Sequence, residues 1–371
     1  MNPLILRFLL NMYVNQSITV RWNGSYSEPF NVSNGVRQGG VVSPVLFTVY
    51  MDELIEKLKK EGIGCHMGRH YCGILGFADD IMLLCPTLDG LRKMIKICED
   101  YANSHSILFN GLKSKLLIYG KYDYDIVVNV NNENVPICTD AEYLGIMLYT
   151  KYEDKYEYVI DGASKFNASF NYCNAIYRSC YSFVKYKLFV QNCGSLYGSQ
   201  LWPLWHSNMQ HFYRQWRKAV RKIMWISPRT HCRYLPLITD SVPVEILSYK
   251  RFLNFYNSMK NSDNNIVKYL ANTSRYCRNS TMGKNVNYLL YKCNIDIEEL
   301  NCITGKQFVK LCVDKWISDL MEEDFINANL IRDMINVRDG YYDLMYIDNS
   351  NYINLFDREQ CNTLLNYLCT A

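Results

Sequence analysis

The stretch Gly73-Ile74-Leu75-Gly76-Phe77-Ala78-Asp79-Asp80-Ile81-Met82-Leu83-Leu84 places two adjacent carboxylates between two short apolar runs. Apolar runs of this length, bounded by Gly and Pro, are typical of buried strands. Asp79 and Asp80 are therefore expected at a tight turn between antiparallel strands, or at the end of a strand. Because buried carboxylates without partners are too costly, we expect them to be exposed at the tip or bound to a cation. An ordinary Asp-containing turn explains the pair equally well at this point.

A glycine-rich loop leads into an expected helix upstream of this turn, in Gly35-Val36-Arg37-Gln38-Gly39-Gly40-Val41-Val42-Ser43-Pro44-Val45-Leu46-Phe47. Ser43 is a natural N-cap, and Pro44 suits the first helical position. The glycines allow a close approach to a flat ligand, while Arg37 and Gln38 can hydrogen-bond a phosphate or a base edge. A plain loop-to-helix entry is the alternative. The apolar face of this helix is expected to consist of Leu46, Val49, Tyr50, Leu54 and Leu58.

Two local patterns flank these segments. Residues 17–32 alternate around Asn23-Gly24, a type I′ turn signal, and predict a hairpin. Residues 89–103 have helical spacing and predict a helix that covers one side of the sheet carrying Asp79.

These sequence motifs resemble the palm of a reverse transcriptase, and their residues are most similar to those of non-LTR (LINE-type) retrotransposons. Two further segments fit in order. Leu108-Phe109-Asn110-Gly111-Leu112-Lys113-Ser114-Lys115 resembles the family's Asn-x-x-Lys-Ser/Thr-Lys segment, and Glu142-Tyr143-Leu144-Gly145-Ile146-Met147-Leu148 resembles its Tyr-Leu-Gly hairpin. The four motifs lie within residues 35–148. Gly39-Gly40-Val41-Val42 departs from the Cys-Pro that the family often has there.

The resemblance implies an α+β fold: a polymerase palm, with an incomplete antiparallel sheet packed by helices, followed by a mostly helical thumb-like region. Residues 1–150 would be a partial palm with a remnant of the fingers. Residues 151–260 would be a basic, helical, thumb-like domain. Residues 261–371 would be a helical C-terminal region, to which the sequence assigns no chemistry.

The resemblance also implies a catalytic site with two Mg²⁺ ions. Asp79 would be a direct metal ligand, and Asp80 its support or a second ligand. The implied partners are an RNA template, a DNA primer and deoxynucleoside triphosphates. The residues expected beside the template, the new base pair and the triphosphate are Arg37, Gln38, Gly39, Lys113 and Lys115.

One element of the family's pattern is missing from the sequence. The family uses another metal-binding Asp, usually in an Asp-x-x-x-Ala-Phe-Asp string on an earlier strand. No such string precedes residue 35, and the first Asp is Asp52, where the family has a helical acid that binds no metal. We therefore expect a sequence truncated at its N-terminus, an incomplete ion site and little or no polymerase activity from the isolated chain.

The charge is uneven along the chain. Residues 160–260 contain fourteen Lys and Arg against three Asp and Glu, a formal charge of +11 within a chain of net charge +4. A basic block of this kind indicates a polyanion partner, although it could instead dock on the acidic remainder of the chain. Five cations recur at i, i+3, i+4, i+7 and i+8 on one expected helix and are predicted to contact a nucleic-acid backbone: Arg214, Arg217, Lys218, Arg221 and Lys222. A solvated charged face is the alternative.

Aromatic residues accompany this basic block. Tyr197, Trp202, Trp205 and Trp216 could stack on bases, but core or interface positions are the more common role for such residues.

Composition excludes several classes of protein. With 371 residues, 49% of them hydrophobic, the chain can form two or three domains and is not disordered as a whole. No apolar run is long enough for a membrane span, and Leu4 to Val14 read as a buried helix behind Asn2 and Pro3 rather than a signal peptide. Fifteen scattered cysteines favour reduced thiols in an intracellular protein, nuclear or cytoplasmic and not secreted.

Three functions therefore remain. The first is RNA-directed DNA synthesis, a nucleotidyltransferase activity, by ancestry. The second is a non-catalytic, nucleic-acid-binding remnant of a retrotransposon. The third and weaker is an intron maturase-like protein, for which no maturase segment or nuclease follows the thumb-like region. The sequence does not identify the element, its target site or an attached endonuclease.

Overall fold

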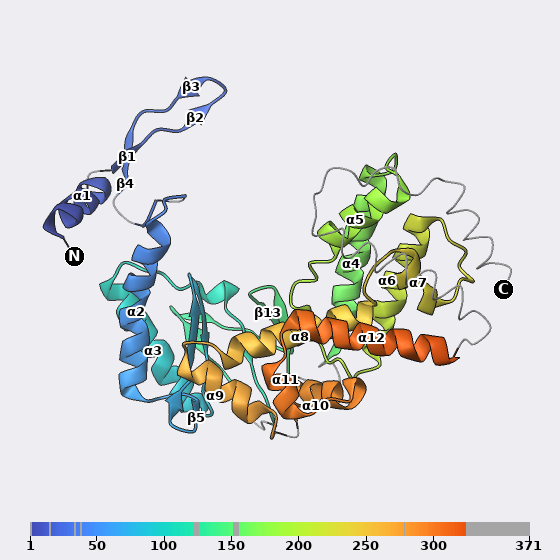
Figure 1. The fold of residues 1–371 in the computed structure, drawn as a ribbon. Helices are drawn as coiled ribbons and strands as arrows, with labels where there is room; N and C mark the ends of the chain where they lie inside the picture. Colours follow the sequence, from blue (N-terminus) through green and yellow to red (C-terminus); the bar gives the residue numbers. More distant parts are fainter. Residues whose placement is uncertain are drawn as a thin grey trace. The chain divides into compact units, whose positions relative to one another are not determined.

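A computed structural model describes residues 2–14, 16–32, 35–37, 39–121, 126–150, 156–277 and 279–323. The chain divides into two compact units, Met1–Cys138 and the residues from Thr139 onward. The first unit is mixed α and β, and the second is mostly helical (Figure 1). The coarse α+β prediction is confirmed. The predicted functional division into residues 1–150, 151–260 and 261–371 stays a prediction.

In its described residues, the first unit has three α-helices, one 3-10 turn and short paired strands. Its elements are α1 (Pro3–Tyr13), β1 (Gln16–Ile18), β2 (Arg21–Trp22), β3 (Ser25–Tyr26), β4 (Phe30–Val32), α2 (Ser43–Glu61), β5 (His66–Met67), β6 (His70–Tyr71), β7 (Ile74–Phe77), β8 (Asp80–Leu83), α3 (Leu88–Ser104), η1 (Gly111–Lys113), β9 (Leu116–Leu117), β10 (Asn129–Val130), β11 (Glu133–Asn134) and β12 (Ile137–Cys138).

The strands of this unit pair as separate two-stranded ladders. In the described residues β1 pairs with β4, β2 with β3, β5 with β6, β7 with β8 and β10 with β11, all antiparallel, while β9 and β12 are parallel. The predicted hairpin over residues 17–32 is confirmed. Asn23 and Gly24 form its two-residue loop with φ of +46° and +86°, as a type I′ turn requires.

Helices α2 and α3 form the core of the first unit with β7. Met51, Leu54 and Leu58 of α2 pack against Met94, Cys98 and Tyr101 of α3 and against Ile74 of β7. The predicted helix over residues 89–103 is therefore confirmed as α3. The expected apolar face of α2 was partly wrong, because Val49 is 67% exposed while Met51 is buried.

Two predictions about helix starts had different outcomes. Asn2 caps α1 as expected, since its Oδ1 accepts the Leu4 amide at 2.9 Å. The N-cap of α2 is Val42, so the prediction for Ser43 was wrong. The Ser43 hydroxyl instead donates to the Arg37 carbonyl at 2.6 Å, which ties the glycine-rich loop to the helix.

Helix α1 contradicts the expectation of a buried segment. No described residue of α1 is buried, and Leu4 and Phe8 are 73% and 64% exposed. The apolar composition showed that the helix could be buried, but burial also needs a neighbour along its length. The described contact that holds its end is a 3.1 Å hydrogen bond between the hydroxyls of Tyr13 and Ser43.

The second unit begins with a hairpin and continues as a helical bundle. Its elements are β13 (Asp140–Tyr143), β14 (Ile146–Tyr149), α4 (Glu157–Ile176), α5 (Ser182–Cys193), η3 (Ser199–Leu201), α6 (Asn208–Met224), η4 (Cys232–Tyr234), α7 (Leu235–Ile238), α8 (Val244–Lys260), α9 (Asn265–Ser274), α10 (Thr281–Cys293), α11 (Ile297–Cys302) and α12 (Gly305–Glu323). The turn of the first hairpin, Leu144-Gly145, has φ of +51° and +76°.

An aromatic core holds the helices of the second unit together. Phe166 of α4 stacks on Trp216 of α6 with ring centroids 5.4 Å apart, and it meets Phe212 edge-on at 5.5 Å. Trp202 packs edge-on against Phe212 at 5.0 Å. Trp202 and Trp216 are therefore core residues, the more common of the two roles considered for them. None of the helices in the described ranges is long and apolar enough to cross a membrane.

Candidate active site on the carboxylate hairpin

The carboxylate pair lies at the tip of the β7–β8 hairpin. Phe77 pairs with Asp80, which leaves Ala78 and Asp79 as a two-residue loop. Ala78 has a φ of +50°, a left-handed conformation that lets the loop close in two residues. Asp79 and Asp80 are both exposed. The prediction of a tight turn between two antiparallel strands is confirmed.

The opposite end of the hairpin is anchored by backbone hydrogen bonds. The Leu84 amide donates to the Gly73 carbonyl at 2.7 Å, and the Cys65 amide donates to the Leu84 carbonyl at 2.9 Å. Gly64 allows this packing, since a Cβ there would lie 2.9 Å from the Cα of Gly73. The hairpin is thus held at its base, and its acidic tip faces solvent.

The surroundings of the two carboxylates fit a hard cation. Within the described ranges, neither Asp79 nor Asp80 has a side-chain hydrogen bond or an ion pair, so their oxygens are available as ligands. Magnesium is commonly bound by one or two carboxylates, with water and substrate phosphates completing its shell. The described ranges of the chain contain no group of three or more His, Cys, Asp or Glu side chains that could hold a metal ion by themselves. The two carboxylates alone would leave most of the coordination shell of such an ion to water or to other ligands.

The glycine-rich loop is tied to the first hairpin of the chain. The Nε of Arg37 donates to the Oε1 of Gln16 at 3.2 Å. Gly39 has a φ of +78° and open space where a side chain would begin, so this turn requires a glycine for its conformation. Gln38, the third residue predicted to lie beside the template, is outside the described residues.

The lysines predicted to approach a triphosphate lie around η1. The Oδ1 of Asn110 accepts the Lys113 amide at 3.0 Å and fixes the turn. Lys113 and Lys115 are both exposed. In the part of the chain that the structure describes, no hydrogen bond or ion pair joins the Asp79–Asp80 turn to Arg37, Lys113 or Lys115. Their roles as substrate-binding residues stay predictions.

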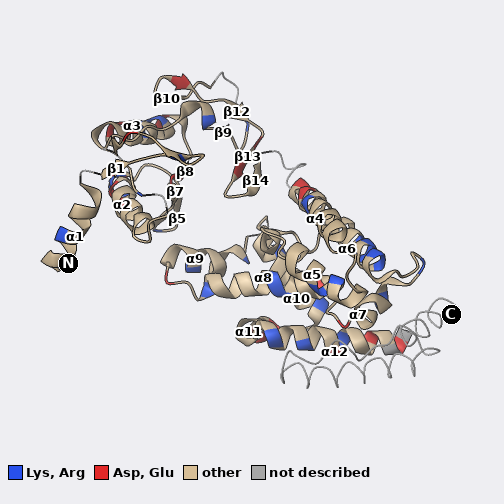
Figure 2. Cartoon of the chain, turned by 90° about the horizontal axis from the view of Figure 1, so that it is seen from above, with Lys and Arg blue, Asp and Glu red and all other residues tan. Residues whose placement is uncertain are grey.

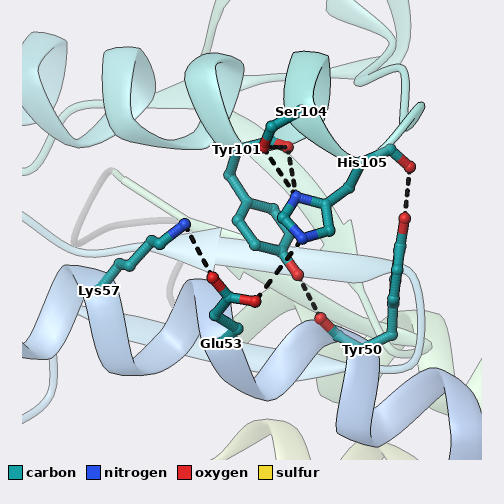
Figure 3. Close-up of polar contacts among 6 residues, drawn as sticks. All are labelled: Tyr50, Glu53, Lys57, Tyr101, Ser104 and His105. Carbon is teal, nitrogen blue, oxygen red and sulfur yellow. Dashed lines mark hydrogen bonds and ion pairs between the residues drawn. The ribbon is translucent and has the colours of Figure 1, made fainter.

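Polar contacts that the sequence did not reveal join the two helices behind the hairpin (Figure 3). The Tyr101 hydroxyl donates to the Tyr50 carbonyl, and the Tyr50 hydroxyl donates to the His105 carbonyl. Glu53 contacts Lys57 at 2.9 Å and the His105 Nε2 at 3.6 Å. The hydrogen bond and charge of Lys57, and more weakly His105, hold the pKa of Glu53 below its ordinary value. The i, i+4 spacing of Glu53 and Lys57 is the sequence signal for part of this network.

The five cations of α6 do not form one uniform stripe. Figure 2 shows Lys and Arg along this helix. Arg217 forms an ion pair with Glu245 of α8, and Arg221 donates to the Thr230 carbonyl at 2.8 Å. The remaining three, Arg214, Lys218 and Lys222, are exposed and spaced four residues apart. We call these three residues the exposed cation row.

Other cations of the basic block also serve the fold. Arg251 donates to the Gly194 carbonyl and, at 3.3 Å, to the Ser199 hydroxyl. Lys185 is 6% exposed, and its burial lowers its pKa. The charge of +11 therefore overstates the positive surface that a partner could contact.

An α+β unit with paired, exposed carboxylates on a hairpin tip is typical of enzymes that use divalent metal ions for phosphoryl transfer. The family model "Reverse transcriptase (RNA-dependent DNA polymerase)" matches residues 3–148, which include the hairpin and all four motifs. By this match, and by the relatives described next, this segment is similar to the reverse transcriptases of non-LTR retrotransposons.

Curated proteins of transposable elements are also similar in sequence to part of this chain. The chain is 31% identical over 106 residues to a retrovirus-related Pol polyprotein from the type-2 retrotransposable element R2DM of Drosophila melanogaster. It is 36% identical over 101 residues to that from the type-1 element R2 of Nasonia vitripennis, and 26% identical over 148 residues to an uncharacterized 149 kDa protein of the transposon TX1 of Xenopus laevis. These alignments cover 29%, 26% and 39% of this chain, and only 10%, 10% and 11% of the relatives.

Proposed function

We propose that this chain contributes the palm and thumb regions of an enzyme that synthesises DNA on an RNA template. In this proposal Asp79 and Asp80 are the carboxylate ligands of Mg²⁺. The observation that carries it is the exposed carboxylate turn on a hairpin held at its base, within the segment that the reverse transcriptase family model matches.

The two carboxylates serve the reaction by fixing where the ions and the substrate phosphates meet. Mg²⁺ bound there would lower the pKa of the attacking 3′-hydroxyl and stabilise the pyrophosphate leaving group. Asp79, in the loop itself, is proposed as the direct ligand, and Asp80, at the first position of β8, as the support or second ligand. Arg37 and Gly39 are proposed beside the template, and Lys113 or Lys115 beside the triphosphate.

A second function, nucleic-acid binding without catalysis, is supported by a different observation. Helix α6 has no Asp or Glu, and it exposes the cation row Arg214, Lys218 and Lys222. Cations with no competing acids on their helix are available to phosphates. This binding function would persist in a chain whose carboxylate site does not catalyse DNA synthesis.

Asp79→Asn and Asp80→Asn test the first proposal, with Asp52→Asn as a matched control on an exposed acid of α2. Any primer extension that the chain shows on an RNA template should require Mg²⁺ and stop with EDTA. Because even indirect partners of a metal site change affinity or activity by about 10- to 100-fold, each site variant should lower extension at least that much. Extension unchanged in both variants would refute the proposed role of these carboxylates.

A second readout applies if extension by this chain is too weak to measure. With added hydrogen peroxide, Fe²⁺ bound in place of Mg²⁺ is oxidised to Fe³⁺ while the peroxide is reduced to hydroxide and a hydroxyl radical, and the radical cleaves the nearby backbone. Cleavage should concentrate at the β7–β8 turn, diminish with added Mg²⁺ and disappear in both site variants but not in Asp52→Asn. A cleavage pattern that is the same in all four proteins contradicts the metal site.

A further inference from the structure

Trp225 ends α6 in a conformation that favours other residue types. The described helices α2, α6 and α10 all have a left-handed residue at the C-terminal end: Gly62, Trp225 and Asn294. Gly and Asn are the residues usually found there. Trp225 has φ of +56° and ψ of +35°, in the left-handed region, where a residue with a Cβ is strained.

The backbone around Trp225 explains the conformation but not the choice of residue. The backbone amides of Trp225 and Ile226 both donate hydrogen bonds to the Arg221 carbonyl, and the distance from the Ile226 nitrogen to that oxygen is 3.0 Å. The side chain of Ile226 is buried. The backbone needs a left-handed residue at position 225, and a glycine would satisfy that need without strain. Leu144 and Leu196 also have a positive φ, so a role outside the fold is inferred only where this conformation coincides with a large exposed side chain, as it does at Trp225.

The side chain of Trp225 is not used in packing. Of the tryptophans in the described ranges, Trp22 and Trp225 are 83% and 82% exposed, while Trp202 and Trp216 belong to the core. An exposed indole presents a large flat face that binds other flat groups well.

The chemistry beside Trp225 identifies those flat groups. The exposed cation row Arg214, Lys218 and Lys222 leads along α6 to a point three residues before Trp225. Four residues of α-helix rise about 6 Å, so the row places one cation for each turn or so of the helix. Cations that track a phosphate backbone beside an aromatic platform are the usual elements of single-strand recognition.

We propose that Trp225 stacks on an unpaired base of a single-stranded nucleic acid whose phosphates lie along Arg214, Lys218 and Lys222. This inference rests on the proposed nucleic-acid binding by α6. A single strand is favoured over a duplex because the base faces of a duplex are already stacked on one another, whereas unpaired bases have a face to offer.

The experiment compares two 12-nucleotide strands that carry the same phosphates: a mixed-sequence RNA and an abasic strand of the same length. Wild-type chain is expected to bind the base-bearing strand about tenfold more tightly, as one stacked base provides. Trp225→Gly should abolish that difference while leaving the affinity for the abasic strand unchanged. Trp225→Tyr should keep most of the difference in affinity between the two strands. Trp22→Gly is the control at an equally exposed tryptophan, and it should bind both strands as the wild type does.

Stability measurements separate binding from folding. Because glycine removes the left-handed strain, the urea midpoint of Trp225→Gly should equal or exceed that of the wild type. A lower midpoint would show that the side chain serves the fold, and would overturn the proposal. Equal binding of both strands by the wild type, or an unchanged preference in Trp225→Gly, would also overturn it.

A charge variant shows which of the two proposals fails. The triple variant Arg214→Glu, Lys218→Glu, Lys222→Glu should lose both strands. If it binds both as the wild type does, or if the wild type binds neither at low salt, nucleic-acid binding by α6 is wrong and the stacking proposal falls with it. If the triple variant loses both strands while the wild type does not distinguish them, binding by α6 stands and only the stacking at Trp225 is wrong.

Discussion

The two units of the chain differ in how much of their apolar surface they bury. In the first unit the buried cluster consists of a few side chains from α2, α3 and β7, and apolar residues such as Leu4, Phe8 and Phe77 stay exposed. In the second unit one cluster runs through α4, α5, α6, α8, α10 and α12. The family motifs mostly lie in the unit with the smaller core. The larger core therefore lies outside residues 3–148, the segment that the reverse transcriptase family model matches.

The largest expected effect is on the free energy of unfolding, when one phenylalanine from each unit is replaced by alanine. Phe212 is fully buried against Phe166, Trp202 and Trp216, so Phe212→Ala should lower the free energy of unfolding by about 3–5 kcal/mol. Phe77 is 63% exposed, and Phe77→Ala should change the free energy of unfolding by less than about 1 kcal/mol. Urea unfolding followed by circular dichroism measures both. Equal losses would show that the two units do not differ in packing as described.

The sequence predicted the local parts of this fold well. The Asn23-Gly24 turn, the Asp79-Asp80 turn and the amphipathic helix ending at Met224 depend on residues close in sequence, so patterns of period 2 and 3.6 were sufficient. The Asp79-Asp80 turn was also the part of the candidate site that could be predicted, because its residues are consecutive.

Other features could not be predicted because they depend on partners distant in sequence. The role of Ser43 changed because the Arg37 carbonyl competes for its hydroxyl, and Arg217 is paired with Glu245 from another helix. Nothing in the pattern of α1 shows that its described residues stay unburied. Trp225 does have a sequence signal, since it stands where a helix rich in Lys and Arg ends without a Gly or Asn.

A smaller effect tests the anchoring of the carboxylate hairpin in the first unit. Gly64 has φ of +126°, and a Cβ there would meet the Cα of Gly73 at 2.9 Å, so both the conformation and the space oppose a side chain. Gly64→Ala should destabilise the first unit by about 1–3 kcal/mol. Gly62→Ala is the matched control: its φ is +64°, with nothing within 4 Å of its Cβ, and it should cost about 1 kcal/mol.

Hydrogen exchange localises this effect to one unit. Faster exchange is expected for the amides of β7 and β8 in Gly64→Ala, with the helices of the second unit unchanged. If exchange accelerates equally in both units, their stabilities are linked and the contrast between a weakly packed and a strongly packed unit is broken.

The smallest expected effect concerns acid sensitivity of the α2–α3 contact. Lys57 and His105 lower the pKa of Glu53 from its ordinary value near 4.5. A carboxyl group whose folded pKa is depressed contributes stability above its unfolded pKa, and this contribution is lost as the pH falls from about 4.5 through the folded value. Glu53→Gln should therefore lower the urea midpoint of the first unit slightly at pH 7 and have no effect once Glu53 is protonated.

The control for this prediction is Glu56→Gln on the same helix. Glu56 pairs with Lys59 at 3.1 Å within α2 and, in the part of the chain that the structure describes, shares no hydrogen bond or ion pair with α3, so it reports the general effect of removing an exposed charge. Because screening weakens exposed ion pairs, the difference between the two variants should also shrink in 1 M NaCl. If Glu53→Gln and Glu56→Gln respond identically to pH, the Glu53–His105 contact does not stabilise the packing of α2 on α3, and the small core of the first unit is held by its apolar side chains and the tyrosine hydroxyl contacts alone.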